Sequence, residues 1–163
     1  MKTGCKIVAG ITILLLANLA TASDQKPGRQ SLVGTWKLNV AKSTWGQVPA
    51  PKEGTLVVLQ DDAMGLKWTE SGVSADGDSF TVSFEGAADE KDYPIRSPDQ
   101  EAVSGFTKAY SNVDGALHSV DKKNGSVIQT STTNVSSDGR TMTIKYVSSD
   151  SSTTWTAVLD RIK

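Results

Sequence analysis

The chain has 163 residues, with 17 basic and 18 acidic side chains and a formal net charge of −1 at pH 7. Charges of both signs are scattered and form no basic stripe, so binding of nucleic acid through its phosphates is not expected. The single cysteine, Cys5, stands at the start of the chain. The remainder therefore offers neither a disulfide nor a cysteine metal site.

The first 22 residues have the three parts of a secretory signal peptide. Lys2 and Lys6 supply positive charge, residues 7–19 are apolar apart from two polar side chains, and Ala20-Thr21-Ala22 is a small-x-small cleavage signal. A spanning helix needs about 20 apolar residues and polar anchors on both sides. A cleaved signal is therefore favoured, and an uncleaved N-terminal anchor is the alternative. We expect export to the periplasm or the extracellular space.

Three segments are predicted: a signal peptide at 1–22, a flexible leader at 23–31 and one domain at 32–163. The leader is polar and holds Pro27 and Gly28. The mature chain would carry 15 basic and 18 acidic residues and no membrane span. A domain of about 140 residues can bury a sufficient core without disulfides.

Short segments of alternating apolar and polar residues follow one another from residue 33. The first alternates Trp36, Leu38 and Val40 with polar residues, and this period of two predicts a strand at 33–40. The connector at 41–53 contains two prolines and is too broken for a long helix. Pro94 marks one later strand as an edge or rim element. Further strands are expected at 55–60, 66–73, 79–85, 92–96, 102–110, 116–122, 126–136, 141–148 and 153–162.

Four turns carry Asp-Gly or Asn-Gly, at residues 76–77, 114–115, 124–125 and 138–139. Such dipeptides suit two-residue hairpins, because both central residues tolerate positive φ. Short turns between consecutive strands predict an up-and-down order, and closure into a barrel removes exposed edges. The fold class predicted is all-β, an antiparallel up-and-down barrel of about 8–10 strands. A Greek-key sandwich is the alternative.

Three motifs resemble known β-barrel families. Gly34-Thr35-Trp36 is similar to the opening motif of the calycin barrels, which include the lipocalins and the fatty-acid-binding proteins. The string GTWKLNVAKS at 34–43, KDYP at 91–94 and DGRTMT at 138–143 together resemble a group of secreted bacterial lipocalin-like proteins. The resemblance spans most of the mature chain and implies a barrel that holds a small apolar ligand.

The resemblance leaves the subfamily open. Fatty-acid-binding proteins place a helix-turn-helix lid after the first strand, and the proline-bearing connector does not look like one. Lipocalins often carry a disulfide, and this domain has none. The resemblance also implies that Gly34 and Trp36 close one barrel end beneath an arginine, for which Arg161 is the candidate. Arg161 shares parity with Leu159, so it can point inward; an exposed C-terminal arginine is the alternative.

The candidate ligand-binding residues are the inward apolar and aromatic side chains, with two tyrosines and the only histidine as polar anchors. Plain core filling is the alternative, because the interior of a barrel of about eight strands is nearly filled by side chains. The candidates are Trp68, Phe80, Phe84, Phe106, Tyr110, His118, Met142, Tyr146 and Trp155.

Catalytic patterns are absent from the sequence. His118 is the only histidine and cannot build a multi-histidine metal site, and Gly72–Asp76 lacks the final glycine of a nucleophile elbow. Glu70 shares parity with Trp68 and can face inward, but no second inward acid stands out. We therefore predict no catalytic residue, no metal and no cofactor.

The function favoured by the sequence is a monomeric, exported carrier of a small hydrophobic ligand. One alternative is a solidly packed barrel that serves as a surface interaction module, with Trp45 as an exposed contact. The other is an enzyme or haem protein that uses His118.

Overall fold

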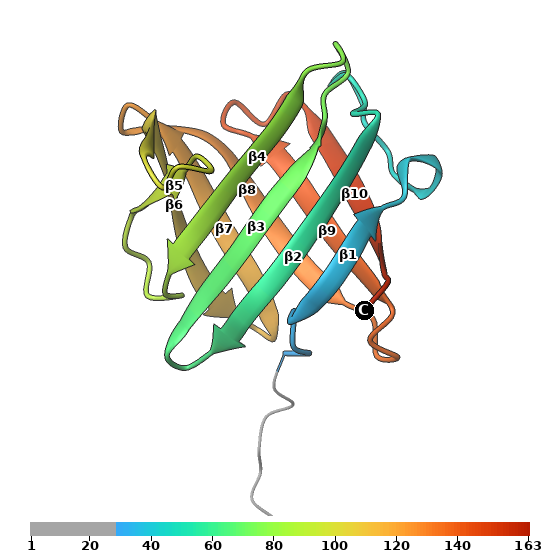
Figure 1. Ribbon diagram of the computed structural model, residues 1–163, viewed down its shortest axis with the longest axis horizontal. Coiled ribbons are helices and arrows are strands. Elements are labelled where there is room, and N and C mark those ends of the chain that lie inside the picture. The colour runs from blue at the N-terminus through green and yellow to red at the C-terminus, as the bar shows by residue number, and fades with distance from the viewer. Residues whose placement is uncertain (1–28) are drawn as a thin grey trace, which may run out of the picture.

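Ten antiparallel strands follow one another around a closed barrel in the computed structural model, which describes residues 29–163 (Figure 1). Each strand pairs with the next along the chain, and the last closes the barrel against the first. The predicted signal peptide and most of the predicted leader lie outside the described residues. The strands are β1 (Gly34–Leu38), β2 (Glu53–Asp62), β3 (Gly65–Val73), β4 (Ser79–Gly86), β5 (Tyr93–Arg96), β6 (Ala102–Val113), β7 (Ala116–Lys123), β8 (Ser126–Val135), β9 (Thr141–Ser148) and β10 (Thr154–Arg161).

This closed barrel confirms the predicted fold class and excludes the sandwich. The connector between β1 and β2 holds only a short 3-10 turn, η1 (Val40–Lys42), where a fatty-acid-binding protein would carry a helical lid. β2 and β6 are longer than predicted, because their polar ends continue the ladder down to the turns. No helix in residues 29–163 has the length and apolar character that crossing a membrane requires.

The four glycine turns are of two kinds. Asp114-Gly115 and Asn124-Gly125 are two-residue hairpins in which both residues have positive φ, between 49° and 79°. The turns at 74–78 and 136–140 are longer, and only their glycines, Gly77 and Gly139, have positive φ. In the second of them the Asp138 carboxylate accepts bonds from the Ser136 hydroxyl and the Arg140 N–H, which makes it an Asx-type loop. The two-residue prediction is therefore wrong for these two turns.

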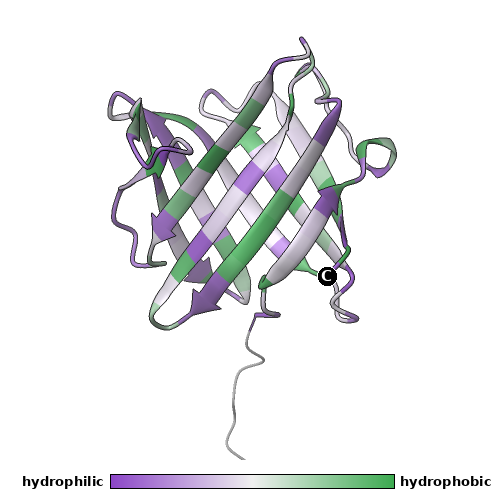
Figure 2. Cartoon of the chain, in the orientation of Figure 1, coloured by the Kyte–Doolittle hydropathy of each residue, from purple (hydrophilic) through white to green (hydrophobic). Residues whose placement is uncertain are grey.

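Alternate residues of a strand point to opposite faces, so each strand divides its side chains between the interior and the solvent. Bands of hydrophobic and hydrophilic residues follow one another along the strands (Figure 2). The fully buried Trp36, Phe84 and Met142 lie in the half of the barrel nearer the C-terminus. Phe84 stacks on Trp68 with ring centroids 5.7 Å apart and meets Tyr110 edge-on at 4.9 Å. These aromatic contacts fill that half, which we call the closed half.

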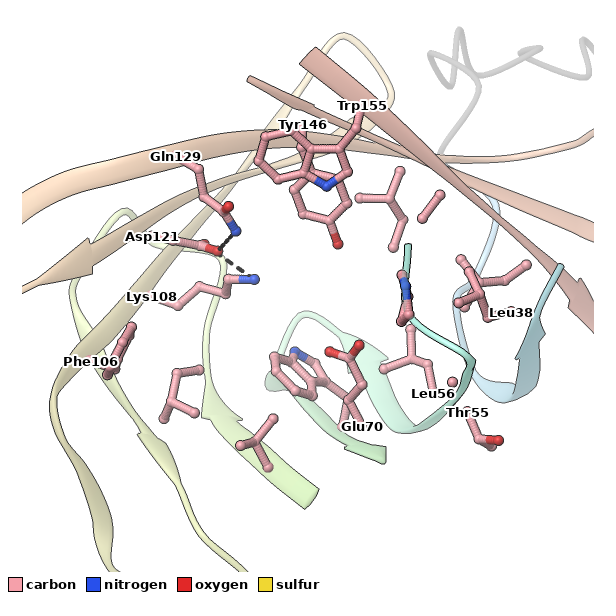
Figure 3. Close-up of a pocket in the computed structure, with 18 of the residues that line it drawn as sticks. Leu38, Thr55, Leu56, Glu70, Phe106, Lys108, Asp121, Gln129, Tyr146 and Trp155 are labelled. Carbon is pink, nitrogen blue, oxygen red and sulfur yellow. Dashed lines mark hydrogen bonds and ion pairs between the residues drawn. The ribbon is translucent and has the colours of Figure 1, made fainter. Parts of the chain in front are cut away.

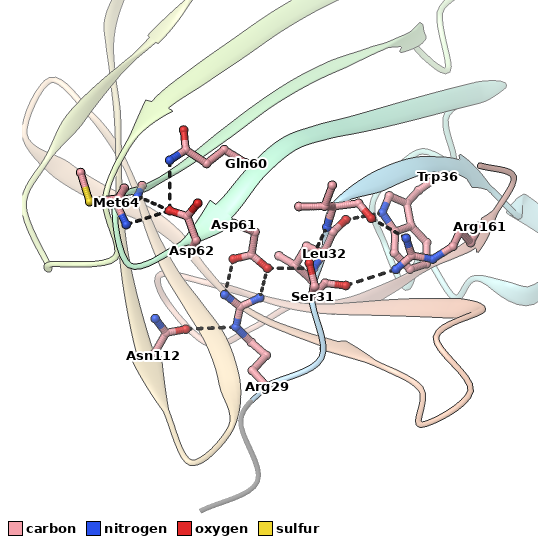
Figure 4. Close-up of polar contacts among 12 residues, drawn as sticks. Arg29, Ser31, Leu32, Trp36, Gln60, Asp61, Asp62, Met64, Asn112 and Arg161 are labelled. Carbon is pink, nitrogen blue, oxygen red and sulfur yellow. Dashed lines mark hydrogen bonds and ion pairs between the residues drawn. The ribbon is translucent and has the colours of Figure 1, made fainter. Parts of the chain in front are cut away.

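Trp36 and Arg161 close the barrel end nearer the C-terminus (Figure 4). The Arg161 Cζ lies 4.0 Å from the centroid of the Trp36 ring, and the guanidinium donates to the carbonyls of Gly139 and Val33. Gly34 has a φ of 143°, and a Cβ there would collide with that guanidinium. The Gly-x-Trp opening thus has a local physical cause: glycine makes room for the arginine that covers the tryptophan.

The residues that precede β1 are tied to the same end. Arg29 forms two bonds to the Asp61 carboxylate and one to Asn112, and the Asp61 carboxylate also accepts the Leu32 N–H at 2.8 Å. The Trp36 indole donates to the Leu32 carbonyl at 2.7 Å. The last residues of the segment that the sequence assigns to a flexible leader, from Arg29 on, therefore have fixed contacts with the barrel.

The junction between β4 and β5 is the weakest pairing around the barrel. Only Ser83 and Arg96 are paired there, whereas β3 and β4 pair along their whole length. β5 is short, and its register with β6 shifts between Pro94 and Arg96. A proline has no N–H to donate, so its place beside this junction agrees with the predicted rim position.

Candidate ligand-binding cavity

A cavity of about 360 Å³ occupies the half of the barrel next to the β1–β2 connector, which we call the open half. This volume lies within the range of roughly 300–1,000 Å³ that is usual for small-molecule sites. Most of the wall is aliphatic or aromatic, and three charged residues interrupt it. Representative apolar members are Leu38, Leu56, Val82, Ile95, Ile144 and Trp155.

The side chains of the cavity wall come from the alternate residues of each strand that point inward. On β3, Trp68 and Glu70 face inward while the exposed Lys67 pairs outside with Glu85. On β6, Phe106 and Lys108 face inward in the same way. Because every strand places alternate residues inside, the charged and the apolar members of the wall come from the same inward rows.

Asp121 is the centre of a polar cluster in the cavity wall (Figure 3). The Lys108 Nζ lies 3.2 Å from its Oδ1, and the two side chains are only 15 % and 13 % exposed. Gln129 donates to Asp121 Oδ2 at 2.7 Å, and the Ser119 hydroxyl donates to Oδ1 at 3.2 Å. Ser119 is in turn bonded to Ser131 at 2.8 Å. Asp121 therefore has a counterion and two hydrogen-bond donors of its own.

Lys108 stays charged in this setting. Burial would lower the pKa of its ammonium, but the nearby Tyr110, Asp121, Tyr146 and Glu70 hold it above the ordinary value. The Nζ also lies 5.6 Å from the centroid of Trp68 and 5.5 Å from that of Tyr110, within cation–π range. Lys108 thus supplies one fixed positive charge to the cavity wall.

Glu70 differs from Asp121 in having no direct partner. Within residues 29–163 its carboxyl group makes no hydrogen bond or ion pair, although it points into the same space as Lys108 and Tyr146 (Figure 3). Burial raises its pKa; Lys108 opposes this rise and Asp121 adds to it. A partly buried carboxyl group without a partner is unusual, because desolvation of an unpaired charge is costly.

Aromatic side chains frame this polar cluster. Tyr146 and Trp155 stack with ring centroids 5.0 Å apart, and the Trp68 indole donates to the Tyr110 hydroxyl at 3.0 Å. Burial raises the pKa of both tyrosines, so their hydroxyls stay protonated at neutral pH. A second cavity of about 50 Å³ lies beneath, toward the closed half, and shares Trp68, Glu70, Lys108 and Tyr146 with the first.

Trp45 in the connector also belongs to the cavity wall, beside Pro51. Its ring packs against the core, so the structure corrects the expectation of an exposed contact residue. Its indole Nε1 is buried and has no hydrogen-bond partner within the described part of the chain. An unpaired buried donor costs about 1–3 kcal/mol.

The nine candidate residues divide into three groups. Trp68, Phe106, Tyr146 and Trp155 line the main cavity, whereas Tyr110 and Met142 line the smaller one. Phe84 and His118 line neither of these cavities, and Phe80 lines a separate, more polar pocket of about 240 Å³ beside Gly72.

The positions of Phe84, Phe80 and His118 outside the main cavity each have a geometric reason. Phe84 lies deeper, in the aromatic core of the closed half. Phe80 pairs with Gly72 at the far end of β3 and β4, and its ring covers that glycine. The side chain of His118 lies on the outer face, because its neighbours Leu117 and Ser119 point inward, and its Nδ1 is 3.2 Å from the Thr132 hydroxyl.

Sequence reasoning overlooked Lys108, Asp121 and Gln129. A signal was present, because Lys108 shares parity with Phe106 and Tyr110, and Asp121 shares parity with Leu117. Charged residues are almost never buried unless they are paired, and the partner of each lies on another strand. Glu70 had the inward parity, but no second inward acid was found for it. Residues 29–163 hold no group of three or more His, Cys, Asp or Glu that could bind a metal ion.

Solved structures with the same architecture include the fluorescent protein UnaG. The wild-type UnaG structure has a TM-score of 0.56 and 18% sequence identity to this chain, and the match covers 80% of this chain and 96% of UnaG. The structure of a UnaG point mutant gives the same score and identity, with 81% and 96% covered. The likeness is one of fold: a calycin-type barrel. No protein-family model matches the sequence, and no curated protein matches it either.

Proposed function

We propose that this protein binds a small, mostly apolar molecule inside the open half of its barrel and acts as an exported carrier. The cavity of about 360 Å³ carries the proposal. Its wall is largely apolar, and its polar groups converge from separate strands on one region. That combination is typical of sites that bury an apolar body and orient it through a few polar contacts.

Two polar groups without partners add support. The Glu70 carboxyl group and the Trp45 indole N–H are both held at the cavity wall without a hydrogen bond from residues 29–163. Buried polar groups are normally satisfied, so the fully buried Trp45 N–H calls for an explanation such as a binding role. Glu70 is half-buried and faces the cavity itself. A bound molecule with complementary polar atoms would satisfy both groups.

The export part of the proposal rests on residues 1–22 alone. The charged start, the apolar run and the small-x-small end predict removal of this segment after Ala22. Mass spectrometry of the protein recovered from its own source should give a chain that begins at Ser23. Recovery of the full chain from the cell interior would refute this part and leave the binding proposal untouched.

The alternative functions have less support. A packed interaction module does not need an internal cavity, and Trp45 lies in the wall of that cavity. A haem protein or enzyme that depends on His118 requires an imidazole inside the barrel, whereas this one lies on the outer face beside Thr132. We propose that the protein is not an enzyme.

The test is a titration with a fluorescent lipid probe, together with native mass spectrometry of the protein from its own source. We expect saturable binding with one probe per chain. Ala157 lines the cavity, so Ala157→Phe should fill part of it and weaken binding. His118→Ala is the matched control on the outer face and should bind as the wild type does. Absence of saturable binding and of any copurified molecule would refute the proposal.

A further inference from the structure

We propose that the ligand presents a nitrogen hydrogen-bond donor, best an ammonium group, to the Glu70 carboxylate, and that the cavity discriminates against carboxylates such as fatty acids. This inference rests on the proposed function, because it names the class of molecule that the same cavity takes. Two observations carry the inference: the number of positive and negative groups in the cavity wall, and the fact that only some of them are already paired.

The charges in the cavity wall are two carboxyl groups and one ammonium group. Glu70, Lys108 and Asp121 are the charged residues that line it within the described chain. Lys108 is bound to Asp121 at 3.2 Å, and its positive charge is therefore already neutralised. A ligand carboxylate would add a negative charge to a space of low dielectric that already holds two carboxyl groups, where like charges repel strongly.

Glu70 is the acceptor left free. Asp121 is occupied by Lys108, Gln129 and Ser119, whereas the Glu70 carboxyl group has no hydrogen bond from residues 29–163. Its position between the larger and the smaller cavity places it at the inner end of any molecule that fills the open half. A cation beside Glu70 would favour its ionised form. An ionised carboxylate offers acceptors only, so the matching ligand group is a donor.

The aromatic surroundings favour the same class of ligand. Trp68 precedes Glu70 on the inward row of β3, and the stacked Tyr146 and Trp155 lie across the cavity (Figure 3). A cationic head group gains from the faces of such rings, whereas an anion does not. The apolar wall toward the connector then accommodates the hydrocarbon part.

The experiment uses three probes with the same alkyl chain: decylamine, decanol and decanoate. Isothermal titration calorimetry at neutral pH measures the Kd of each for the wild type, Glu70→Gln and Glu85→Gln. Glu85→Gln is the matched control, because Glu85 lies on the outer face and pairs with Lys67. Circular dichroism checks that all three proteins are folded.

We expect decylamine to bind most tightly and decanoate most weakly to the wild type. Glu70→Gln should weaken decylamine at least about tenfold, the loss expected for a hydrogen bond to a charged group. The same change should leave decanol nearly unaffected and strengthen decanoate, while Glu85→Gln changes none of the three.

The possible failures are distinguishable. Binding of decanoate as tight as that of decylamine would overturn the inference and leave the proposed function standing. Unweakened decylamine binding in Glu70→Gln would also overturn it, because Glu70 would then not be the acceptor. If none of the three probes binds, the proposed function itself fails, and the inference fails with it.

Discussion

At the scale of single residues, Glu70, Lys108 and Asp121 form a largely buried group in which only Lys108 and Asp121 are paired. Lys108 lies 3.2 Å from Asp121 and also acts on the pKa of Glu70. A buried ion pair contributes little net stability, but removal of one partner leaves the other charge buried without a counterion. The cluster is therefore a stability risk that a purely structural core would avoid, which supports a role in binding.

The first prediction concerns Lys108. Lys108→Met should lower the free energy of unfolding by about 3–5 kcal/mol, because Asp121 would lose its counterion and Glu70 a nearby positive charge. The double variant Lys108→Met, Asp121→Asn should recover part of this loss. The exposed Lys67→Met should cost less than about 1 kcal/mol. Urea denaturation measures all three, and equal losses at Lys108 and Lys67 would contradict the buried cluster.

The second prediction concerns the pH dependence that Glu70 imposes. Burial raises its pKa above the ordinary value of 4.5, so the folded protein holds a proton that the unfolded chain has released. The free energy of unfolding contributed by this group should therefore fall as pH rises from 4.5 to the folded pKa, and stay level above it. The groups around it, Lys108, Asp121, Tyr110 and Tyr146, are the same in Glu70→Gln.

Urea denaturation of the wild type and Glu70→Gln from about pH 4 to pH 8 isolates this effect. The wild type should lose stability relative to Glu70→Gln as pH increases. Exposed carboxylates such as Asp150, whose pKa is lowered to about 2 by bonds from Ser148 and Ser152, titrate alike in both proteins. A difference that is constant, or that rises with pH, would contradict a buried Glu70.

At the scale of elements, one stacked pair of side chains from β1 and β10 covers the closed end of the barrel. Trp36 is fully buried, and Arg161 covers its ring while bonding to backbone carbonyls on two other segments. Gly34 leaves the space that the guanidinium occupies. The closed end thus depends on three residues from the two ends of the domain.

The third prediction is a double-mutant cycle on this pair. Trp36→Leu and Arg161→Leu should each destabilise the protein, and their coupling energy should be about 0.5–2 kcal/mol, as expected for a cation–π contact. Gly34→Ala should destabilise it as well, since the added methyl group would displace Arg161. Thermal or urea unfolding measures each variant. Additive effects of the Trp36 and Arg161 substitutions would show that the two side chains are not coupled.

The sequence predicts those structural features that are determined by neighbouring residues, and it does not predict contacts between residues on different strands. The strand at 141–148 and the barrel order follow from alternation and glycine turns, which are local signals. Lys108 and Asp121 could not be paired from sequence, because their contact depends on the register between β6 and β7. The prediction of His118 as a cavity residue was wrong for a local reason. It stands between Leu117 and Ser119, which point inward, and strand alternation cannot turn all three inward.

At the scale of the whole molecule, the barrel is divided into a closed half and an open half. Aromatic packing around Phe84 and the stack of Trp36 and Arg161 fill the closed half, whereas the open half retains about 360 Å³. The tightly packed closed half can therefore supply most of the stability of the fold, while the cavity in the open half reduces that stability. This division is what allows a small barrel without disulfides to hold a ligand.

A ligand that binds only the folded barrel should raise its stability by mass action. The fourth prediction is that decylamine at about 100 times its Kd raises the free energy of unfolding by about 2.7 kcal/mol. The cavity-filling Ala157→Phe should show a smaller gain at the same concentration. Thermal unfolding with and without the probe measures both, and an equal gain in the two proteins would place the binding outside the cavity.

The four tryptophans of the chain allow the most direct test of where a ligand binds. Trp45, Trp68 and Trp155 line the main cavity, and Trp36 lies in the closed half. Their indole N–H resonances can be followed by NMR during a titration with decylamine. We predict saturable shifts for Trp45, Trp68 and Trp155 and no shift for Trp36. Unchanged cavity resonances, or equal shifts at all four indoles, would contradict a ligand site in the open half of the barrel.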